Sequence, residues 1–374
     1  MNVQSAVLDR YSDGAKEVQA ALCCPVSYDQ GLLKQLPQEI IDKDYGCGDP
    51  SRYVRSGDTV LDLGSGGGKI CYMAAQLVGK HGHVIGVDMN DDMLALARKY
   101  QPEMAKKLGS DRVKFVKGHI QDLALDVDAM EQYLAQHPVR SAHDLTALHK
   151  WQHQQRTRTA LIADNSVDLV ISNCVLNLVH DDEKKQLVEE IYRVLKPGGR
   201  VAISDIISDE LIPEKLKADD ELWSGCISGA FQEQEFIQRF LDAGFLAVAY
   251  DKWEANPWQT VDGIEFRSAT LTAQKGAATP CMDRGHAVIY RGPFSSVSDD
   301  EDHIYPRGER MAVCERTFKL LTEEAPYKDH FIGIAPNQLC DAVAWCAPTG
   351  TRRPATETKG AHHSGDSCGP SSCC

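Results

Sequence analysis

Four cysteines lie in segments where their thiols could do chemistry together. Cys71 follows a glycine-rich run, Cys174 ends an apolar stretch, and Cys47 and Cys226 each follow a glycine. Loops after the strands of an open parallel sheet meet at its carboxyl edge, so thiols far apart in the sequence can converge there. Thiolates bind soft metals and metalloids. Any one of these cysteines could instead be a buried structural residue, and this alternative stays open at this point.

The glycine-rich run is Asp62-Leu63-Gly64-Ser65-Gly66-Gly67-Gly68, with a glycine at every second position from Gly64. Such a turn brings backbone against a ligand, and the following helix offers unpaired N–H groups. A dinucleotide fingerprint would need its third glycine at position 69, where this chain has Lys69, so the spacing disfavours NAD. Asp88 lies about twenty residues further on, where a carboxylate can accept the hydroxyls of a ribose. Loop and carboxylate together suit S-adenosylmethionine.

The order of this loop, Asp88 and the turn Pro197-Gly198-Gly199 resembles the class I methyltransferase fold. Met89 and Met93 are placed to cover an adenine face, although ordinary core methionines would look the same. Ile120 follows the third expected strand, where this fold contacts the base. The cofactor-binding residues that we expect are Asp62, Gly64, Ser65, Gly66, Gly68, Asp88, Met89, Met93, Ile120 and Asn173.

From Thr59 onward, short apolar runs alternate with helical stretches, which indicates βαβ units and a parallel sheet. The fold class that we expect is therefore α/β, with a doubly wound, mostly parallel sheet. The expected strands are 59–63, 83–88, 113–116, 167–172 and 200–205, and the expected helices are 69–78, 91–107 and 182–195.

The chain length of 374 residues allows one large α/β core and a smaller domain. We expect an N-terminal segment over 1–45, a methyltransferase domain over 46–255, a smaller C-terminal domain over 256–350 and a disordered tail over 351–374. The αβ rhythm stops after Gln274, and Gly276-Ala277-Ala278-Thr279-Pro280 is typical of a boundary.

Residues 123–164 form a polar, helix-prone insertion where a short connection would suffice. His149 and His153 are four residues apart but have no evident third ligand, so we interpret the insertion as a solvated helical excursion. The tail contains Cys368, Cys373 and Cys374, which either capture a soft metal or metalloid or belong to a variable terminus.

The net charge of −14 disfavours nucleic acid as a partner, because phosphate contacts need clustered Lys and Arg. The N-terminus has no signal-peptide pattern, and no segment has the apolar length of a membrane span. The thirteen cysteines are therefore expected to stay largely reduced. We expect a cytoplasmic monomer that contacts no membrane.

The acceptor of the methyl group must be inferred from the segment Asn173-Cys174-Val175-Leu176-Asn177-Leu178. Methyltransferases that act on amide or base nitrogens usually carry an Asn/Asp-Pro-Pro-aromatic turn here, and cytosine-5 enzymes carry Pro-Cys. This chain has neither. Methyl transfer from a sulfonium needs mainly a nucleophile with a free lone pair held in line with the methyl carbon.

Four segments together resemble the arsenite methyltransferase family, which methylates trivalent arsenic. They are Tyr45-Gly46-Cys47-Gly48, the glycine loop running into Cys71-Tyr72, Ser172-Asn173-Cys174-Val175-Leu176-Asn177-Leu178, and Gly225-Cys226-Ile227-Ser228-Gly229-Ala230. The likeness extends through Ala287–Phe294 to Ala312-Val313-Cys314. The insertion over 123–164 departs from the family's compact connection.

The resemblance implies that Cys174 and Cys226 hold As(III) as thiolates, with Cys71 as a third ligand in part of the cycle. It also implies that Cys47 and Cys71 supply two electrons by forming a disulfide, which thioredoxin or glutathione then reduces. The function would be arsenic detoxification. Two alternatives are a small-molecule C- or O-methyltransferase and a non-catalytic, thiol-rich arsenic binder.

The remaining cysteines are expected to be peripheral or structural. Cys23 and Cys24 form a vicinal pair before Pro25 that we interpret as peripheral. The structural ones lie beyond the expected methyltransferase domain: Cys281, Cys314, Cys340 and Cys346.

Overall fold

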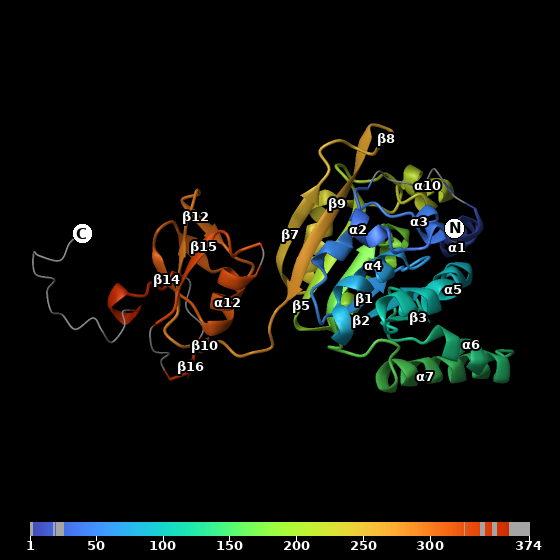
Figure 1. Cartoon of the computed structure of the whole chain (residues 1–374), viewed down its shortest axis with the longest axis horizontal. Coiled ribbons are helices and arrows are strands. Elements are labelled where there is room, and N and C mark those ends of the chain that lie inside the picture. The colour runs from blue at the N-terminus through green and yellow to red at the C-terminus, as the bar shows by residue number, and fades with distance from the viewer. Residues whose placement is uncertain are drawn as a thin grey trace, which may run out of the picture. The chain divides into compact units, whose positions relative to one another are not determined.

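The structure is a computed structural model that describes residues 3–17, 19, 26–324, 326–336, 341–345 and 350–358. The chain forms two compact units, Met1–Gly276 and Ala277–Cys374 (Figure 1). The division falls at the glycine-alanine segment noted in the sequence. The expected domain boundary at 255/256 is wrong, because two strands beyond it belong to the first unit.

The first unit is built on one nine-stranded sheet with the strand order β3-β2-β1-β4-β5-β9-β7. Strands β1 to β5 run parallel, whereas β9 is antiparallel to both β5 and β7. Two short strands, β6 and β8, pair with β5 and β9. The expected α/β fold with a mostly parallel sheet is confirmed. The strands of this sheet are β1 (Thr59–Leu63), β2 (His83–Asp88), β3 (Val113–Lys117), β4 (Val167–Asn173), β5 (Leu195–Ser208), β6 (Phe231–Gln232), β7 (Phe245–Trp253), β8 (Gln259–Val261) and β9 (Ile264–Lys275).

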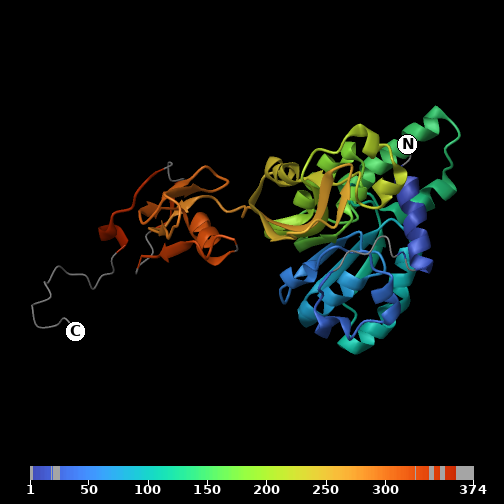
Figure 2. The same cartoon turned by 90° about the horizontal axis from the view of Figure 1, so that it is seen from above.

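Helices cover both faces of the sheet (Figures 1 and 2), and β1 shows why. Val60 packs into one hydrophobic cluster with residues of the helices that follow β1 and β2. Leu61 and Leu63 pack into a second cluster with Leu187 and Phe236, which lie on later helices. A strand that is apolar on both sides needs a helical layer on each, which makes the sheet doubly wound. The main covering helices are α4 (Lys69–Leu77), α5 (Asp91–Leu108), α8 (Asp181–Val194) and α11 (Glu233–Asp242).

Short helical elements flank the sheet. Before β1 these are α1 (Val3–Lys16), α2 (Gln30–Leu33), α3 (Gln38–Asp42) and the 3-10 turn η2 (Pro50–Tyr53), and η3 (Gly79–His81) lies between α4 and β2. At the carboxyl edge, where the candidate site lies, η4 (Leu176–Leu178) follows β4, and α9 (Glu214–Lys217) and α10 (Asp220–Ser224) follow β5.

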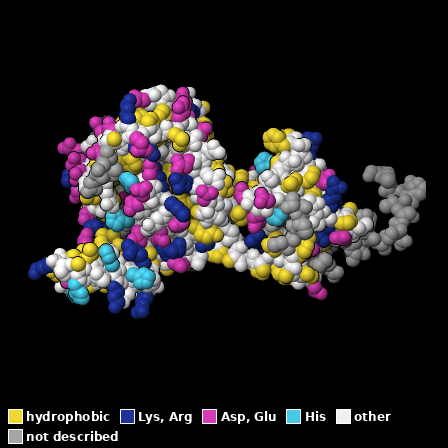
Figure 3. Space-filling view, turned by 180° about the vertical axis from the view of Figure 1, so that it is seen from behind, with side chains coloured by type: hydrophobic (Ala, Val, Ile, Leu, Met, Phe, Trp, Pro, Cys, Tyr) yellow, Lys and Arg dark blue, Asp and Glu magenta, His cyan; other side chains and the backbone are white. Residues whose placement is uncertain are grey.

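The insertion forms two helices, α6 (Val127–Gln136) and α7 (Ala142–Arg158), as the sequence pattern predicts. No residue of α7 is buried, and the stacked rings of Tyr133 and Trp151, with centroids 4.7 Å apart, join the two helices. Their surface displays basic and histidine side chains (Figure 3). His149 and His153 are both exposed and belong to no metal-binding cluster among the described residues.

The second unit has its own small core around the three-stranded antiparallel sheet β14-β11-β15. Its residues 351–358 are ordered: Ala312 N–H donates to Thr351 O at 3.0 Å, and Arg353 pairs with Asp283 at 2.8 Å. The expectation of a disordered tail from residue 351 is therefore wrong for this stretch. The elements of this unit are β10 (Met282–Asp283), β11 (Ala287–Tyr290), β12 (Ser296–Ser298), β13 (Ile304–Pro306), β14 (Arg310–Ala312), α12 (Glu315–Glu323), β15 (Phe331–Ile334), β16 (Val343–Ala344) and η5 (Ala355–Thr358).

Several sequence expectations fall on residues outside the described ranges. These are the vicinal pair Cys23 and Cys24, and Cys340, Cys346, Cys368, Cys373 and Cys374. Within the described ranges, no helix has both the length and the apolar character needed to cross a membrane.

Truncation tests the revised boundary. A chain that ends at Gly276 should unfold cooperatively in urea and keep the first unit's sheet, because residues 266–274 still pair with 200–208 of β5. A chain that ends at residue 255 should aggregate or lose cooperativity, because it exposes the edge of β5 and loses buried Phe266 and Leu271. Equal urea midpoints for the two truncated chains would contradict the assignment of β9 to this unit.

Candidate active site

The loop between β1 and α4 depends on glycines with left-handed backbone. Gly64 has φ +67° and Gly68 has φ +86°. A Cβ at Gly64 would lie 2.3 Å from Val175, and a Cβ at Gly68 would lie 2.8 Å from Phe115. Gly66, with φ +49°, has no heavy atom closer than 4.0 Å to such a Cβ and faces open space. The loop therefore packs tightly at both ends and leaves its centre open to a ligand.

That open space is a cavity of about 280 Å³ at the carboxyl edge of the sheet. Nine of the ten expected cofactor residues line it, and Gly68 is the exception because it caps the start of α4. Asp88 accepts backbone hydrogen bonds from Gly66 and Asn90, both at 2.8 Å, and each of its oxygens keeps a lone pair for a ligand. The buried Ser65 Oγ finds no partner among the described residues.

The cavity floor carries two buried carboxyl groups. Burial raises the pKa of Asp62 to about 7, although a hydrogen bond from the Cys71 thiol opposes the shift. Burial also raises the pKa of Asp88, against backbone hydrogen bonds that lower it. A cationic ligand would favour the ionised form of both groups and would offset the cost of desolvating them. The cavity suits a ribose-bearing, positively charged molecule.

Sequence reasoning did not assign several residues of the cavity wall to the cofactor. Tyr45, Gly46, Val175 and Leu178 lie in segments that carry the family resemblance, but they were not expected to contact the cofactor. The others lie outside those segments: Gln4, Val7, Leu8 and Tyr11 of α1, and Lys43, Asp44, Asn90, Gln121, Val179, His180 and Glu183. Among these, Asn90 had a local signal, since its side chain accepts from Met93 N–H as the N-cap of α5.

The side chain of Asn173 holds the Cys47 loop against the ends of β4 and β5. Its Oδ1 accepts N–H groups from Cys47 at 2.9 Å and from Gly48 at 3.0 Å. Its Nδ2 donates to Gly48 O at 2.9 Å and to Tyr28 Oη at 3.2 Å. A Cβ at Gly46 would lie 2.0 Å from this amide, so only glycine permits the approach. Asn173 lines the cavity as expected, but its amide is fully engaged by the loop.

Three of the four candidate thiols converge on one buried cluster. Cys47 and Cys174 form a disulfide with Cα atoms 5.8 Å apart, and Cys226 Sγ donates to Cys174 O at 3.4 Å. All three side chains are at most 5% exposed, and they pack with apolar residues such as Ile206 and Phe266. Cys174 also lines the cavity of about 280 Å³ beside the glycine loop, the donor cavity, so the thiol cluster and this cavity share a wall.

Cys71 lies elsewhere, and in this structure Cys47 pairs with Cys174 instead of the Cys71 that the resemblance implied. Its position near the start of α4 turns the thiol toward the sheet, against Gly86 of β2, and not toward the carboxyl edge. Its Sγ donates to Asp62 Oδ2 at 3.2 Å in a fully buried environment. Burial and the neighbouring carboxylate raise the pKa of the Cys71 thiol well above its usual range, so it stays protonated there.

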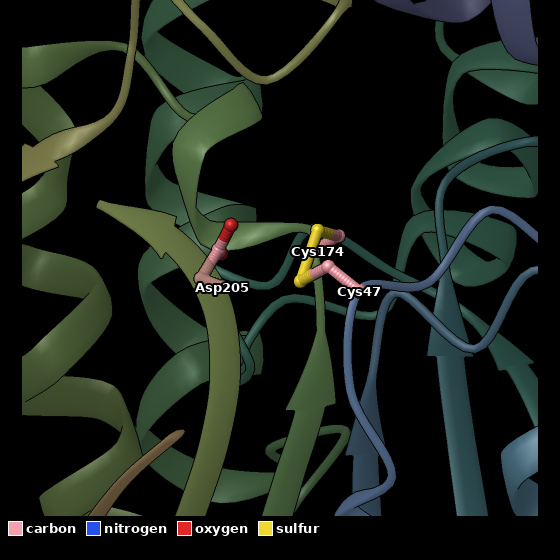
Figure 4. Close-up of side chains that lie close together, drawn as sticks. All are labelled: Cys47, Cys174 and Asp205. Atoms are coloured by element: carbon pink, nitrogen blue, oxygen red, sulfur yellow. A yellow bond between two sulfur atoms is a disulfide. The ribbon is translucent and has the colours of Figure 1, made fainter. Parts of the chain in front are cut away.

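A buried carboxylate that the sequence did not indicate faces the disulfide. Asp205 of β5 has an oxygen within 4.8 Å of both the Cys47 and the Cys174 sulfur (Figure 4). Its two oxygens accept N–H groups from Leu176 at 2.9 Å and Ile206 at 2.8 Å. Burial raises the pKa of Asp205 to about 7. It stands one residue after Ser204 on a strand that looked like ordinary core, so only the fold could reveal its position.

Two of the thiols sit on strained backbone. Cys174 has φ +60° and Cys226 has φ +64°, a conformation that costs a residue with a side chain about 1–3 kcal/mol. Hydrogen bonds hold both turns, from Cys174 N–H to Ser204 O at 2.8 Å and from Asn177 Nδ2 to Ile206 O at 2.7 Å and Cys226 O at 3.3 Å. Such strain commonly marks functional positions.

The sheet order, the glycine loop with its buried ribose-type carboxylate, and the position of the cavity together define a class I, S-adenosylmethionine-dependent methyltransferase. A family described as a methyltransferase domain matches residues 54–136 and 147–244. The chain is also similar to arsenite methyltransferases over most of its length, and it belongs to the arsenite methyltransferase family.

Three similar proteins span both units. The arsenite methyltransferase of Aquipseudomonas alcaligenes is 32% identical over 348 residues, which cover 88% of each chain. The mouse arsenite methyltransferase is 29% identical and covers 89% of this chain and 80% of its own. A solved arsenic(III) S-adenosylmethionine methyltransferase from Chlamydomonas reinhardtii aligns with a TM-score of 0.57 at 27% identity, over 86% of this chain and 99% of its own. Residues 277–363 match a domain of unknown function.

Replacing the amide that holds the loop tests this geometry. Asn173→Ala should lower the free energy of unfolding by about 1–3 kcal/mol, because it leaves two buried N–H groups without an acceptor. It should also lower the yield of the Cys47–Cys174 disulfide in peptide maps under non-reducing conditions. Asn173→Asp keeps the acceptor for both N–H groups and should recover part of the loss. Unchanged stability and disulfide yield in Asn173→Ala would show that the loop is held by other contacts.

Proposed function

We propose that this chain transfers methyl groups from S-adenosylmethionine to trivalent arsenic bound by the thiolates of Cys174 and Cys226, for detoxification in the cytoplasm. The observation that carries the proposal is the position of these thiols. Cys226 Sγ lies 3.4 Å from Cys174 O, and Cys174 forms part of the wall of the donor cavity. An acceptor held between them would face the methyl donor directly. The family to which the chain belongs supports the same chemistry.

The cavity residues fit the donor. Asp88 would accept the ribose hydroxyls, the centre of the glycine loop would contact the donor, and Met89 and Met93 would cover the adenine. When bound, S-adenosylmethionine supplies an electrophilic methyl group on a sulfonium. Asp62 and Asp88 provide the negative charge that a cationic donor needs in a buried cavity.

The thiols fit the acceptor. Arsenite forms As–S bonds with two thiols as two of its hydroxyl groups leave as water, and the bound arsenic keeps its lone pair. Cys174 and Cys226 lie in a buried, mainly apolar cluster, which excludes water from the bound arsenic. No base is needed at arsenic, because the lone pair is free to attack. The protein's task is to hold arsenic in line with the methyl group.

Arsenic loses two electrons when its lone pair forms the new carbon bond, so a further methylation needs a two-electron reductant. Two protein thiols supply these electrons when they form a disulfide, and the structure contains one between Cys47 and Cys174. In that state Cys174 cannot bind arsenic. We propose that thioredoxin or glutathione, the two reductants that the family resemblance implies, reduces this disulfide and restores the Cys174 thiol. The enzyme is proposed to work as a monomer.

The ligand set proposed here contains Cys174 and Cys226 without Cys71. The resemblance implied Cys71 as a third ligand, but its thiol lies in a different cluster and bonds to Asp62. A role for Cys71 in arsenic binding would require this hydrogen bond to break and the thiol to leave the sheet face of α4.

Serine variants test the arsenic ligands. Cys174→Ser and Cys226→Ser should each lower methylated arsenic by at least about a hundred-fold, because one As–S bond is lost, while binding of S-adenosylhomocysteine is kept. Products are measured by chromatography with labelled donor in the presence of thiol. Cys314→Ser, which removes a buried thiol of the second unit, is the matched control and should keep activity. Full arsenite methylation by both variants would favour a carbon or oxygen acceptor, and donor binding without methylated arsenic in the unaltered chain would indicate a pure binder.

The redox state tests the role of Cys47. After oxidation and removal of free thiol, the unaltered chain should form no methylated arsenic in a single turnover, because Cys174 is held in the disulfide. Cys47→Ser should complete that first turnover without added reductant, and a thiol should be needed only for later rounds. Single-turnover product is counted from labelled donor. An unaltered chain that methylates arsenite while peptide mapping shows the disulfide intact would refute this assignment.

A further inference from the structure

Helix α1 contacts both the donor cavity and the loop that carries Cys226. Val7 and Leu8 line the cavity. Asn90, two residues after Asp88, donates from its Nδ2 to Leu8 O at 3.1 Å and to Ser12 Oγ at 3.0 Å. These contacts fix one side of the helix to the strand end that forms the ribose site.

The other side of α1 is fixed to the acceptor loop. Arg10 donates from its Nη1 to Glu221 O at 2.8 Å and to Ser224 Oγ at 2.9 Å, directly before Gly225 and Cys226. Helices α1 and α10 pack against each other at the same end of the sheet (Figure 1). The helix thus contacts both the strand end that carries Asp88 and the loop that carries Cys226, which are more than a hundred residues apart in the sequence.

Tyr11 stands where the two parts meet. It lines the donor cavity, and its Oη lies 3.9 Å from Cys226 Sγ. Its ring packs edge-on against Tyr45, with centroids 6.1 Å apart. A tyrosine hydroxyl carries a proton and can donate a hydrogen bond to sulfur.

We propose that Tyr11 is a positioning residue for the acceptor: it donates a hydrogen bond to the Cys226 thiolate and thereby couples donor binding to arsenite binding. The inference rests on the proposed function, because it takes Cys226 as an arsenic ligand. A donor in the cavity gives Val7 and Leu8 a surface to pack on and stabilises α1 in place. The tyrosine hydroxyl is then held at Cys226.

The physical reason is the cost of a buried thiolate. Cys226 is 5% exposed and surrounded by apolar residues, so few solvent hydrogen bonds can stabilise its charge. Hydrogen bonds to charged groups are strong enough to change an equilibrium constant by about ten-fold or more. Because binding free energies are reciprocal, the same factor must appear in donor affinity when arsenite is added.

This reciprocity gives the test. The dissociation constant of S-adenosylhomocysteine is measured by calorimetry on the reduced full chain, with and without arsenite. The quantity compared is the ratio of the dissociation constant without arsenite to that with arsenite. Arsenic bound at thiols remote from the cavity does not change donor affinity and therefore does not change this ratio. In the unaltered chain arsenite should tighten donor binding, and in Cys226→Ser it should have no effect.

Tyr11→Phe keeps the ring and removes the hydroxyl, so it should reduce this ratio by about ten-fold. Tyr72→Phe is the matched control, because it removes a buried hydroxyl that donates to Ala97 O away from the cavity, and it should keep the ratio. Arg10→Met loosens the acceptor loop without touching the cavity wall and should also reduce the ratio. If Tyr11→Phe does not fold, the affinity ratio of Arg10→Met tests the proposal in its place.

An unchanged ratio in Tyr11→Phe, or no effect of arsenite on donor affinity in the unaltered chain, would overturn the inference. Failure of the proposed function looks different, because the unaltered chain would then form no methylated arsenic at all. In the steady state, Tyr11→Phe should raise the KM for arsenite and leave the KM for S-adenosylmethionine at low arsenite nearly unchanged. A purely structural role would raise both constants together.

Discussion

The cysteine cluster depends on one side-chain amide at the end of a parallel strand. Asn173 uses both its oxygen and its nitrogen to hold the loop that carries Cys47, and its neighbour Cys174 turns into the same space. A second hydrogen bond, from Ser268 Oγ to Cys47 O at 2.7 Å, supports the same position of the loop. The glycines on either side of Cys47 let the loop approach, and the amide holds it there. The pairing of two thiols 127 residues apart follows from this contact.

In the proposed function, the donor and acceptor sites are joined because Cys174 belongs to both. The turn that positions its thiol also completes the wall of the donor cavity, next to Val175, which packs on Gly64 of the glycine loop. A change in the thiol cluster therefore reaches the donor cavity through Cys174 itself, and also through Tyr11, which lines the cavity and contacts Cys226. Asp205 adds a buried carboxyl group next to the disulfide, and it accepts the Leu176 N–H in the turn after Cys174.

Local patterns predicted the parts of this structure that depend on local physics. The βα alternation and the glycine loop follow from residues close in sequence, and nine of the ten expected cofactor residues line the cavity. The disulfide partner of Cys47 was mispredicted because it depends on which face of α4 carries Cys71. The domain boundary was misplaced because β9 joins the sheet antiparallel, after the parallel rhythm has ended. Asp205 and helix α1 carry no motif, so only the packed fold brings them to the site.

The left-handed backbone at Cys174 and Cys226 has an evolutionary consequence. Glycine or asparagine fits that conformation at less cost than cysteine, so replacing either residue by one of them would relieve strain in the fold. At Cys226, selection for stability alone would therefore favour replacement, so the sulfur itself must be under selection. At Cys174 the disulfide with Cys47 offsets the strain in the oxidised state. A duplicated copy released from that selection would lose its thiols early and remain a well-folded, donor-binding protein. Related chains that lack cysteine at these two positions are thus expected to keep the fold and the donor cavity without arsenite methylation.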